Sequence, residues 1–410
     1  MHHNTYLNAL VLYLLTWIIS GQGTASPVIF PVYGNVYPLG YYNVTIMVGN
    51  PPKPYFLDID TGSDFTWLQC DANGDPCTNC FKAPHTHYKP DKLNQVPCNE
   101  PICQSFQPHG DDNCLRSPET NEQCDYEVQY ADHVSSLGVL VWDNVFLDLA
   151  NGTSVTPRLA FGCGYDQEVH RGYEAPYVDG ILGLGKGGPS ILTQLQTMGV
   201  TRNVLGHCFS NSSRGGGGGY LFFGDIPMLG IAWTPILTPS DHYHLGLADL
   251  QYSGRQTTTN IVKGLEVIFD SGSTYTYFNA RAYGALVDAI NEGLKGKKLE
   301  VTVNDKSLPV CWKRRGEPFK SIDDAINYFK PLALAFTNGK HVQFELSPES
   351  YLVVTEKEHV CLGILNGSEV GLGDTNIIGD ISMQDKLVIY DNERNQVGWA
   401  PANCNTNPKP

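Results

Sequence analysis

Two short carboxylate turns in one chain constrain its fold more than any other feature of the sequence. The first reads Asp60-Thr61-Gly62-Ser63 and the second, 210 residues later, reads Asp270-Ser271-Gly272-Ser273. Each follows an apolar run, which predicts a strand that ends in a tight turn. Glycine permits such a turn, and the neighbouring Thr and Ser hydroxyl groups can orient the carboxylate. If the turns face each other, the two carboxyl groups share one proton, because like charges that close cannot both ionise, and together they supply an acid and a base.

The surroundings of the two turns repeat as well. The first turn is followed by Phe65, Trp67 and later Ile181-Leu182-Gly183, and the second by Tyr275, Tyr277 and later Ile377-Ile378-Gly379. A long-period duplication with one carboxylate in each copy indicates a two-lobed protein whose site lies between the lobes.

At these residues the sequence resembles the pepsin-like aspartic proteases, and more closely their plant nucellin-like and nepenthesin-like branch. The resemblance runs from about Val32 to Cys404. The segments that carry it are Leu57-Asp58-Ile59-Asp60-Thr61-Gly62-Ser63-Asp64, Trp67-Leu68-Gln69-Cys70, Phe161-Gly162-Cys163-Gly164 and Asp179-Gly180-Ile181-Leu182-Gly183-Leu184-Gly185.

The resemblance implies an all-β, bilobal fold with few short helices and an active site between two pseudo-symmetric lobes. The expected N-terminal lobe, residues 26–236, holds the first catalytic Asp, a Cys-rich insert and a flap, and the C-terminal lobe, residues 237–410, holds the second. The implied activity is that of an aspartic endopeptidase, in which a water between Asp60 and Asp270 attacks the peptide bond at acid pH. Polypeptides are the expected substrates, the expected state is a monomer, and no metal or other cofactor is implied.

The residues themselves predict a β-rich chain, since short apolar or alternating runs are broken by Gly, Pro and Asn. Residues 42–48, 139–147 and 387–390 are examples. Helices are expected over residues 189–198, which start with Pro-Ser, and over residues 280–294, whose apolar side chains fall on one face.

A strand, a polar turn and a second strand are expected between residues 124 and 138. The segment resembles the family's flap, which implies substrate contacts for Tyr130, Ala131 and Asp132 and a hydrogen bond from Trp67 to the Tyr130 hydroxyl. The flap tip departs from the family pattern, because His133 and Val134 stand where glycine is usual, and a β-branched residue with positive φ would be strained.

Asp58 is a second departure, because the family has an apolar residue here that lines the primary substrate pocket. Side chains in a strand alternate, so Asp58 and Asp60 are expected on one face. Asp58 could accept a basic or hydrogen-bonding side chain and raise the pKa values of the catalytic pair. The alternative is that backbone amides or a nearby hydroxyl hold Asp58 in a structural role.

The twelve cysteines are an even number and fit an oxidising compartment. Seven lie between Cys70 and Cys124, in a polar stretch expected to form a surface insert. Cys70, Cys77 and Cys80, followed by His85 and His87, also have the spacing of zinc ligands, so a zinc site is an alternative to disulfides here. Resemblance to the nepenthesin-like enzymes implies the pairs Cys70–Cys77, Cys80–Cys163, Cys98–Cys124, Cys103–Cys114, Cys208–Cys404 and Cys311–Cys361.

The N-terminus reads as a secretory signal, since residues 6–20 are nearly all apolar and small residues follow. Residues 1–25 are therefore a predicted signal peptide. No later segment is apolar enough to span a bilayer, and the tail carries no membrane anchor. Secretion to the cell exterior or delivery to the vacuole is expected, with glycosylation sequons at Asn43, Asn151, Asn211 and Asn366.

Nucleic acid and nucleotides are disfavoured as partners. The net charge of −15 argues against a phosphate backbone. The glycine-rich run at residues 183–188 matches a dinucleotide fingerprint, but it does not sit in an alternating strand–helix chain.

A binding protein on the same fold is the rival prediction. Some plant relatives inhibit glycan-degrading enzymes and have lost catalytic residues. Both carboxylates and both glycines of the turns are intact here, which favours catalysis.

Overall fold

The computed structural model describes residues 26–71, 76–106, 114, 123–131, 134–168, 175–211, 217–253, 258–302, 308–337 and 342–408. The predicted signal peptide and the flap-tip residues Asp132 and His133 lie outside these ranges.

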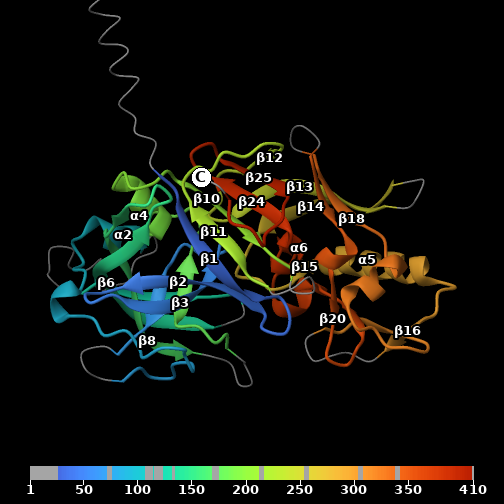
Figure 1. Cartoon of the computed structure of the whole chain (residues 1–410), viewed down its shortest axis with the longest axis horizontal. Helices are drawn as coiled ribbons and strands as arrows, with labels where there is room; N and C mark the ends of the chain where they lie inside the picture. The colour runs from blue at the N-terminus through green and yellow to red at the C-terminus, as the bar shows by residue number, and fades with distance from the viewer. Residues whose placement is uncertain are drawn as a thin grey trace, which may run out of the picture.

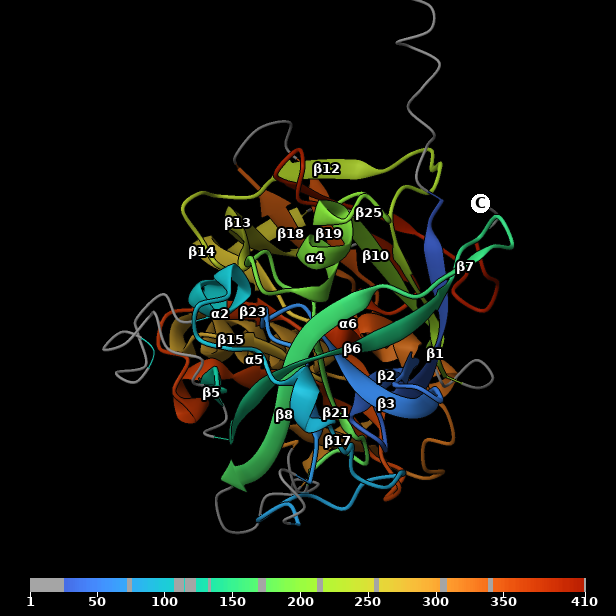
Figure 2. The same ribbon diagram turned by 90° about the vertical axis from the view of Figure 1, so that its left-hand side faces the viewer.

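The largest sheet of the described chain has 14 strands and spans both halves of the molecule. Its order is β12 (Ala232–Pro235), β25 (Gln396–Pro401), β24 (Lys386–Asp391), β10 (Val204–Phe209), β11 (Gly219–Phe223), β1 (Val28–Asn35), β2 (Tyr41–Val48), β3 (Lys53–Asp60), β9 (Gly180–Gly183), β4 (Trp67–Gln69), β8 (Arg158–Glu168), β6 (Ser135–Asp148) and β5 (Asp125–Gln129), with β7 (Ser154–Val155) pairing to β6. Figure 2 shows the long strands β6 and β8 running side by side across the N-terminal half.

Two further sheets belong to the C-terminal half. One is ordered β19 (Gln343–Leu346), β18 (Leu332–Phe336), β13 (Tyr243–Ser253), β14 (Thr258–Phe269), β23 (Asn376–Ile378), β15 (Thr276–Phe278) and β22 (Ile364–Asn366). The other is ordered β16 (Leu299–Thr302), β17 (Cys311–Arg314), β21 (Val360–Leu362) and β20 (Leu352–Val354). The prediction of a β-dominated fold is confirmed.

Short helices cover these sheets. They are α2 (Pro101–Phe106), α4 (Ile191–Thr197), α5 (Ala280–Leu294) and α6 (Asp380–Met383), with 3₁₀ turns η1 (Lys92–Asn94), η3 (Ile322–Asp324), η4 (Ile326–Tyr328), η5 (Pro348–Ser350) and η6 (Gly367–Val370). The two helices predicted from the sequence are α4 and α5. Their N-cap side chains, Ser190 and Asn279, accept backbone hydrogen bonds, as helix starts require.

The repeat in the sequence corresponds to a repeated strand arrangement. In the first copy β9 runs parallel to β3, with Asp60 opposite Gly183, and antiparallel to β4. In the second copy β23 runs parallel to β14 and antiparallel to β15. In each copy, therefore, the strand that leads to a carboxylate turn lies beside the Ile/Leu-Gly strand that follows much later in the chain.

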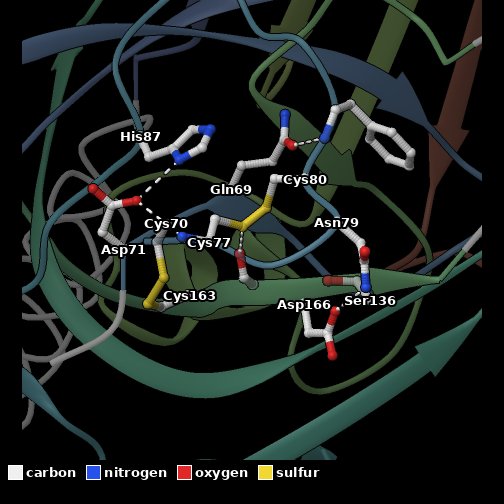
Figure 3. Close-up of a disulfide and its surroundings, with 12 residues drawn as sticks. Gln69, Cys70, Asp71, Cys77, Asn79, Cys80, His87, Ser136, Cys163 and Asp166 are labelled. Atoms are coloured by element: carbon white, nitrogen blue, oxygen red, sulfur yellow. Dashed lines mark hydrogen bonds and ion pairs between the residues drawn. A yellow bond between two sulfur atoms is a disulfide. The ribbon is translucent and has the colours of Figure 1, made fainter. Parts of the chain in front are cut away.

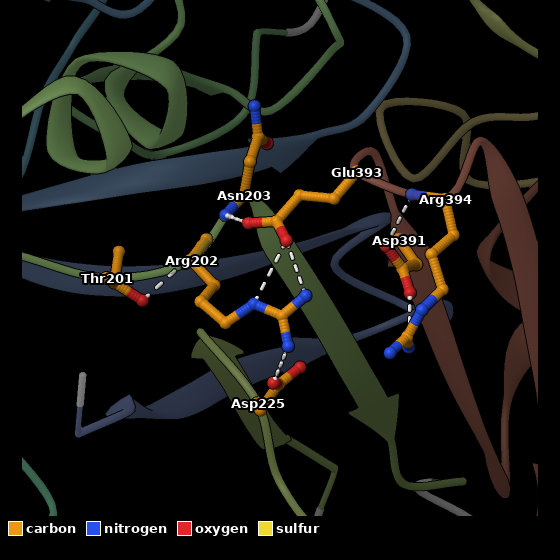
Figure 4. A network of polar contacts seen from close by, with 7 residues as sticks. All are labelled: Thr201, Arg202, Asn203, Asp225, Asp391, Glu393 and Arg394. Carbon is orange, nitrogen blue, oxygen red and sulfur yellow. Dashed lines mark hydrogen bonds and ion pairs between the residues drawn. The ribbon is translucent and has the colours of Figure 1, made fainter. Parts of the chain in front are cut away.

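The last strands of the chain return to the sheet of the N-terminal half. Strand β24 pairs with both β10 and β25, so the centre of the molecule combines strands from the middle and from the last part of the sequence (Figure 1). An ion network secures this junction (Figure 4). Arg202, before β10, contacts the carboxylates of Asp225 and Glu393, and the Asn203 amide donates to Glu393 Oε1 at 3.0 Å.

The disulfides correct part of the predicted pairing. Cys208–Cys404 and Cys311–Cys361 are confirmed. The other four predicted pairs, Cys70–Cys77, Cys80–Cys163, Cys98–Cys124 and Cys103–Cys114, are wrong, because the structure joins Cys70–Cys163, Cys77–Cys80, Cys98–Cys114 and Cys103–Cys124.

Strand pairing explains the first exchange of partners. Strands β4 and β8 run parallel with Leu68 opposite Cys163, so the Cα atoms of Cys70 and Cys163 lie only 5.3 Å apart. Cys77 and Cys80 then remain together in the adjoining loop (Figure 3).

The Cys-rich insert is also less superficial than expected. Cys98, Cys103, Cys114 and Cys124 are buried in one cluster with Phe65, Trp67, Val96, Tyr126, Leu140 and Ala160. The insert thus contributes a small core of its own beside the β5–β6 hairpin.

The disulfide Cys208–Cys404 closes the longest covalent loop, with a sequence separation of 196, whereas Cys77 and Cys80 are separated by 3. Since a disulfide stabilises mainly by restricting the unfolded chain, we expect the double variant Cys208→Ser/Cys404→Ser to lose about 2–5 kcal/mol of unfolding free energy. Cys77→Ser/Cys80→Ser is the matched control and should lose less. Denaturant unfolding measures both, and equal losses would contradict the prediction.

Candidate active site

The first turn is placed by strand β3. Its side chains Tyr55, Leu57 and Ile59 are buried in the core, while Asp58 is half-buried on the opposite face. Asp60 is the last residue of β3 and is only 6% exposed. The second turn begins directly after β14, so both carboxylates stand where a buried strand ends.

Each aspartate is held by its own turn. The Gly62 amide donates to Asp60 Oδ1 at 2.8 Å, and the Ser63 hydroxyl donates to Asp60 Oδ2. In the second turn the Gly272 amide donates to Asp270 Oδ1 at 2.9 Å, and the Ser273 hydroxyl donates to Asp270 Oδ2 at 2.8 Å. The two serines therefore lie where the sequence predicted orienting groups.

The two turns are locked to each other by buried backbone and hydroxyl groups. The Thr61 amide donates to Ser271 Oγ at 3.1 Å, and the Ser271 amide donates to Thr61 Oγ1 at 2.9 Å. Ser271 Oγ in turn donates to the Ile59 carbonyl at 2.8 Å. This reciprocal pair of bonds fixes the distance between the lobes at the site.

Each turn needs a glycine because the carboxylate of the opposite turn leaves no space for a side chain. A Cβ atom at Gly62 would lie well inside van der Waals contact with Asp270, and one at Gly272 would collide with Asp60 in the same way. The turns therefore face each other closely, as the paired motif predicts.

The pair shares a strongly perturbed electrostatic environment. Burial, followed by the negative charge of Asp270, raises the pKa of Asp60 to about 7. Hydrogen bonds from Ser63 and Gly62 act in the opposite direction but do not cancel the effect. At acid pH the pair therefore retains a proton, which is the arrangement that acid–base chemistry on one water needs.

Asp58 and Asp380 extend this acidic environment. Burial and the charge of Asp60 raise the pKa of Asp58, and burial and the charge of Asp58 raise the pKa of Asp380. Sequence reasoning missed Asp380. Asp380 directly follows the Ile-Ile-Gly segment of the second copy, whereas Leu184 stands at the matching position of the first copy. That difference between the copies was the signal available in the sequence.

The predicted flap is a hairpin. Strands β5 and β6 pair antiparallel, and the Tyr130 amide donates to the Val134 carbonyl at 2.8 Å. Trp67 Nε1 donates to the Tyr130 hydroxyl at 2.7 Å, as predicted. Burial, followed by the negative charge of Asp60, raises the pKa of the same hydroxyl, so the flap tyrosine lies close to the first carboxylate turn. Ala131 follows it on the exposed surface.

Behind the first turn lies a buried polar chain that the sequence did not reveal. The Tyr390 hydroxyl lies near the Thr61 side chain, and His207 Nε2 lies 3.1 Å from the same hydroxyl. Burial lowers the pKa of His207 to about 3, so the ring is neutral over most of the acid range.

Two alternatives weighed from the sequence find no support. Cys70, Cys77 and Cys80 are all in disulfides, and His85 and His87 pair with Asp179 and Asp71. A three-cysteine cluster, Cys103, Cys114 and Cys124, is likewise consumed by disulfides. In the glycine-rich run the Asp64 carboxylate accepts from Gly187 at 2.8 Å and occupies the space a phosphate would need.

The sequons differ in accessibility. Asn43 is 7% exposed within β2, and Asn211 is 8% exposed, so glycosylation of these two is less favoured and stays an untested prediction. Asn151 is exposed and Asn366 is half-buried, and glycosylation of these two stays a prediction.

Comparisons with known proteins agree with this geometry. The model described as Xylanase inhibitor N-terminal matches residues 42–225, and Xylanase inhibitor C-terminal matches residues 242–401. An aspartic proteinase of Oryza sativa subsp. japonica is 43% identical over 395 residues, covering 94% of this chain and 93% of its own.

Two solved structures share the fold. Basic 7S globulin from soybean superposes with a TM-score of 0.69 at 17% identity, over 94% of this chain and 99% of its own. Aspartic proteinase from Irpex lacteus superposes with a TM-score of 0.64 at 18% identity, over 94% of this chain and 100% of its own.

The fold and paired turns define the class as bilobal, pepsin-like proteins. Because of its match to the Oryza sativa proteinase, the chain belongs to the plant pepsin-like aspartic proteinase family. The lobe boundary between residues 236 and 237 stays a prediction. None of the described helices is long and apolar enough to cross a membrane.

The buried carboxyl groups make stability depend on pH. Their folded-state pKa values lie above the value of about 3.9 for an unperturbed aspartate, so their stabilisation is fully present below pH ~4 and is lost as the pH rises through the folded-state values. For Asp60 this window ends near pH 7. The contribution of His207 to stability has the opposite pH dependence. It is fully present above the ordinary histidine pKa of 6.5 and is lost as the pH falls toward its folded-state pKa of about 3.

We therefore expect the unfolding free energy of Asp380→Asn to fall less than that of the wild type when the pH is raised from 4 to 7. Each unit of raised pKa that is removed corresponds to about 1.4 kcal/mol, and the His207 contribution cancels between the two proteins. Urea unfolding at both pH values measures the difference. Asp288→Asn on exposed α5 is the control, and an Asp380→Asn protein that behaves like this control would contradict the prediction.

Proposed function

We propose that this protein is an acid endopeptidase that hydrolyses peptide bonds with Asp60 and Asp270. The observation that carries the proposal is the reciprocal geometry of the two turns, in which each glycine amide holds its own carboxylate and faces the other one. Two carboxyl groups in that arrangement hold one proton between them and can act on a single water.

In the proposed reaction the ionised carboxylate removes a proton from a water that attacks the scissile carbonyl. The protonated carboxyl hydrogen-bonds the carbonyl oxygen and then helps to pass a proton to the leaving nitrogen. The two carboxyl groups titrate as a unit and keep one proton between them. Ser63 and Ser273 keep the carboxylate planes aligned.

The flap supplies the third working part. Trp67 holds the flap tyrosine close to the carboxyl pair. Closure of the hairpin over a peptide would therefore exclude water from that pair. Polypeptides bound between the lobes are the proposed substrates, with a monomer as the working form. Secretion or vacuolar delivery is the proposed route, as the predicted signal peptide indicates.

A catalytically silent binding protein is the second candidate. It is favoured by the inhibitor name of the matching family models and by the 7S globulin neighbour. The intact carboxyl pair supports catalysis instead. Digestion of a denatured protein at acid pH, with sensitivity to pepstatin, distinguishes the two candidates.

Replacing either carboxylate tests the mechanism. We expect Asp60→Asn and Asp270→Asn each to lower kcat by a factor of roughly 10²–10⁴ or more, because each removes one partner of the acid–base pair. Peptide hydrolysis at acid pH gives the rate, and thermal unfolding verifies the fold. Undiminished turnover in either folded variant would refute the mechanism.

The flap tyrosine gives a separate test. We expect Tyr130→Phe to lower kcat/KM by about tenfold, since a charge-adjacent hydrogen bond in a partly buried site contributes about 1.5 kcal/mol. Steady-state hydrolysis of one peptide measures the effect. Tyr33→Phe, on the exposed surface, is the matched control, and equal activities would remove Tyr130 from the proposed closure.

A further inference from the structure

One face of the N-terminal lobe beside the carboxyl pair carries an unusual row of side chains. Strand pairing places Asn43 of β2 opposite Asp58 of β3, and Asp58 opposite Ile181 of β9. Directly paired residues project from the same face of a sheet. Because β3 buries its other face in the core, this row lies on the same side as Asp60.

One end of the row consists of acceptors that lack donors. Asn43 is 7% exposed, yet its Oδ1 has no hydrogen-bond partner. Asp380 is 1% exposed, lies close enough for its charge to act on Asp58, and also has an unpartnered Oδ1. Asp58 is half-buried and lies near the charges of Asp60 and Asp270.

Within the part of the chain that the structure describes, these carboxylates lack a cationic partner. Among the ion pairs of the described residues, none involves Asp58, Asp60, Asp270 or Asp380. The buried Lys386 follows α6 and donates instead to Ser350 and to the Gln384 carbonyl. Buried charge without a partner is costly, so the cluster attracts a donor-rich cation.

The other end of the row is apolar. Ile181 is half-buried and packs against the cluster that contains Phe65 and Trp67, with Tyr130 of the flap beside it. A surface that is apolar at one end and rich in acceptors at the other matches the long, amphipathic side chains of lysine and arginine, whose stems pack on apolar surface while their heads seek charge.

We propose that the row formed by Ile181, Asp58 and Asn43, with Asp380 behind it, is a pocket for a basic substrate side chain next to the scissile bond. The stem lies against Ile181, and the ammonium or guanidinium group binds Asp58 and Asn43. This pocket rests on the proposed endopeptidase function and adds a preference for lysine or arginine to it.

The pocket also makes the preference depend on pH. The titratable groups that face Asp58 are Tyr41 of β2, Asp60, Asp270 and Asp380, whereas β9 contributes none. Lys82 lies further out, over the ring of Tyr177. Burial, followed by the negative charge of Asp60, raises the pKa of Asp58 and so disfavours its carboxylate form. A bound cation favours the carboxylate, so the preference for lysine increases as the pH rises and Asp58 ionises more readily.

The test compares peptides that differ only in lysine or its uncharged isostere norleucine on either side of the cleaved bond. At pH 4 and pH 5.5 we expect the wild type to show at least a tenfold higher kcat/KM for lysine on one side, with a larger ratio at pH 5.5. Asp58→Asn should reduce this ratio to near one. Asp288→Asn, the same substitution on exposed α5, should retain the wild-type ratio.

Each outcome bears on a different claim. If the wild type cleaves neither peptide, the endopeptidase function fails. If it cleaves both equally, or if the lysine preference survives in Asp58→Asn or falls in Asp288→Asn, the pocket is overturned and the function stands. Should Asp58→Asn fail to fold, Asn43→Leu replaces it: a ratio reduced several-fold supports the pocket, and an unchanged ratio overturns it.

Discussion

The repulsion between two buried carboxylates is the interaction on which the structure of this site depends. Burial raises the pKa of Asp60, and the nearby charge of Asp270 raises it further. Left alone, such groups would move apart. They remain together because Thr61 and Ser271 exchange hydrogen bonds between the turns, while glycine leaves space for each opposing carboxylate. The retained proton follows from this enforced proximity.

The scaffold explains how one chain forms that arrangement twice. In each half, the strand before the aspartate lies parallel to a short strand that arrives more than a hundred residues later. Parallel pairing of distant segments requires a large fold to bring them together. The lobes thus position the turns, and the cross-turn bonds set the final alignment.

Much of this site was predictable because local sequence encodes local geometry. Aspartate, glycine and serine within four residues specify a turn with its own internal hydrogen bonds, and the Trp67–Tyr130 contact followed from family resemblance. The disulfides of the Cys-rich insert were not predictable in the same way. Cys70 meets Cys163 only because β4 runs beside β8, and no local spacing encodes that neighbourhood. Asp380 was missed for the same reason, since its closeness to Asp58 arises between lobes.

The central sheet has a consequence for how the protein is made. Strand β10 pairs with β24, whose residues lie close to the C-terminus, and Cys404 lies further on still. Contacts between segments so far apart in sequence form late and slowly. The sheet that joins the lobes therefore stays incomplete until nearly the whole polypeptide has been synthesised. A nascent chain contains both carboxylate turns long before it can align them, so the order of synthesis itself delays assembly of the carboxyl pair.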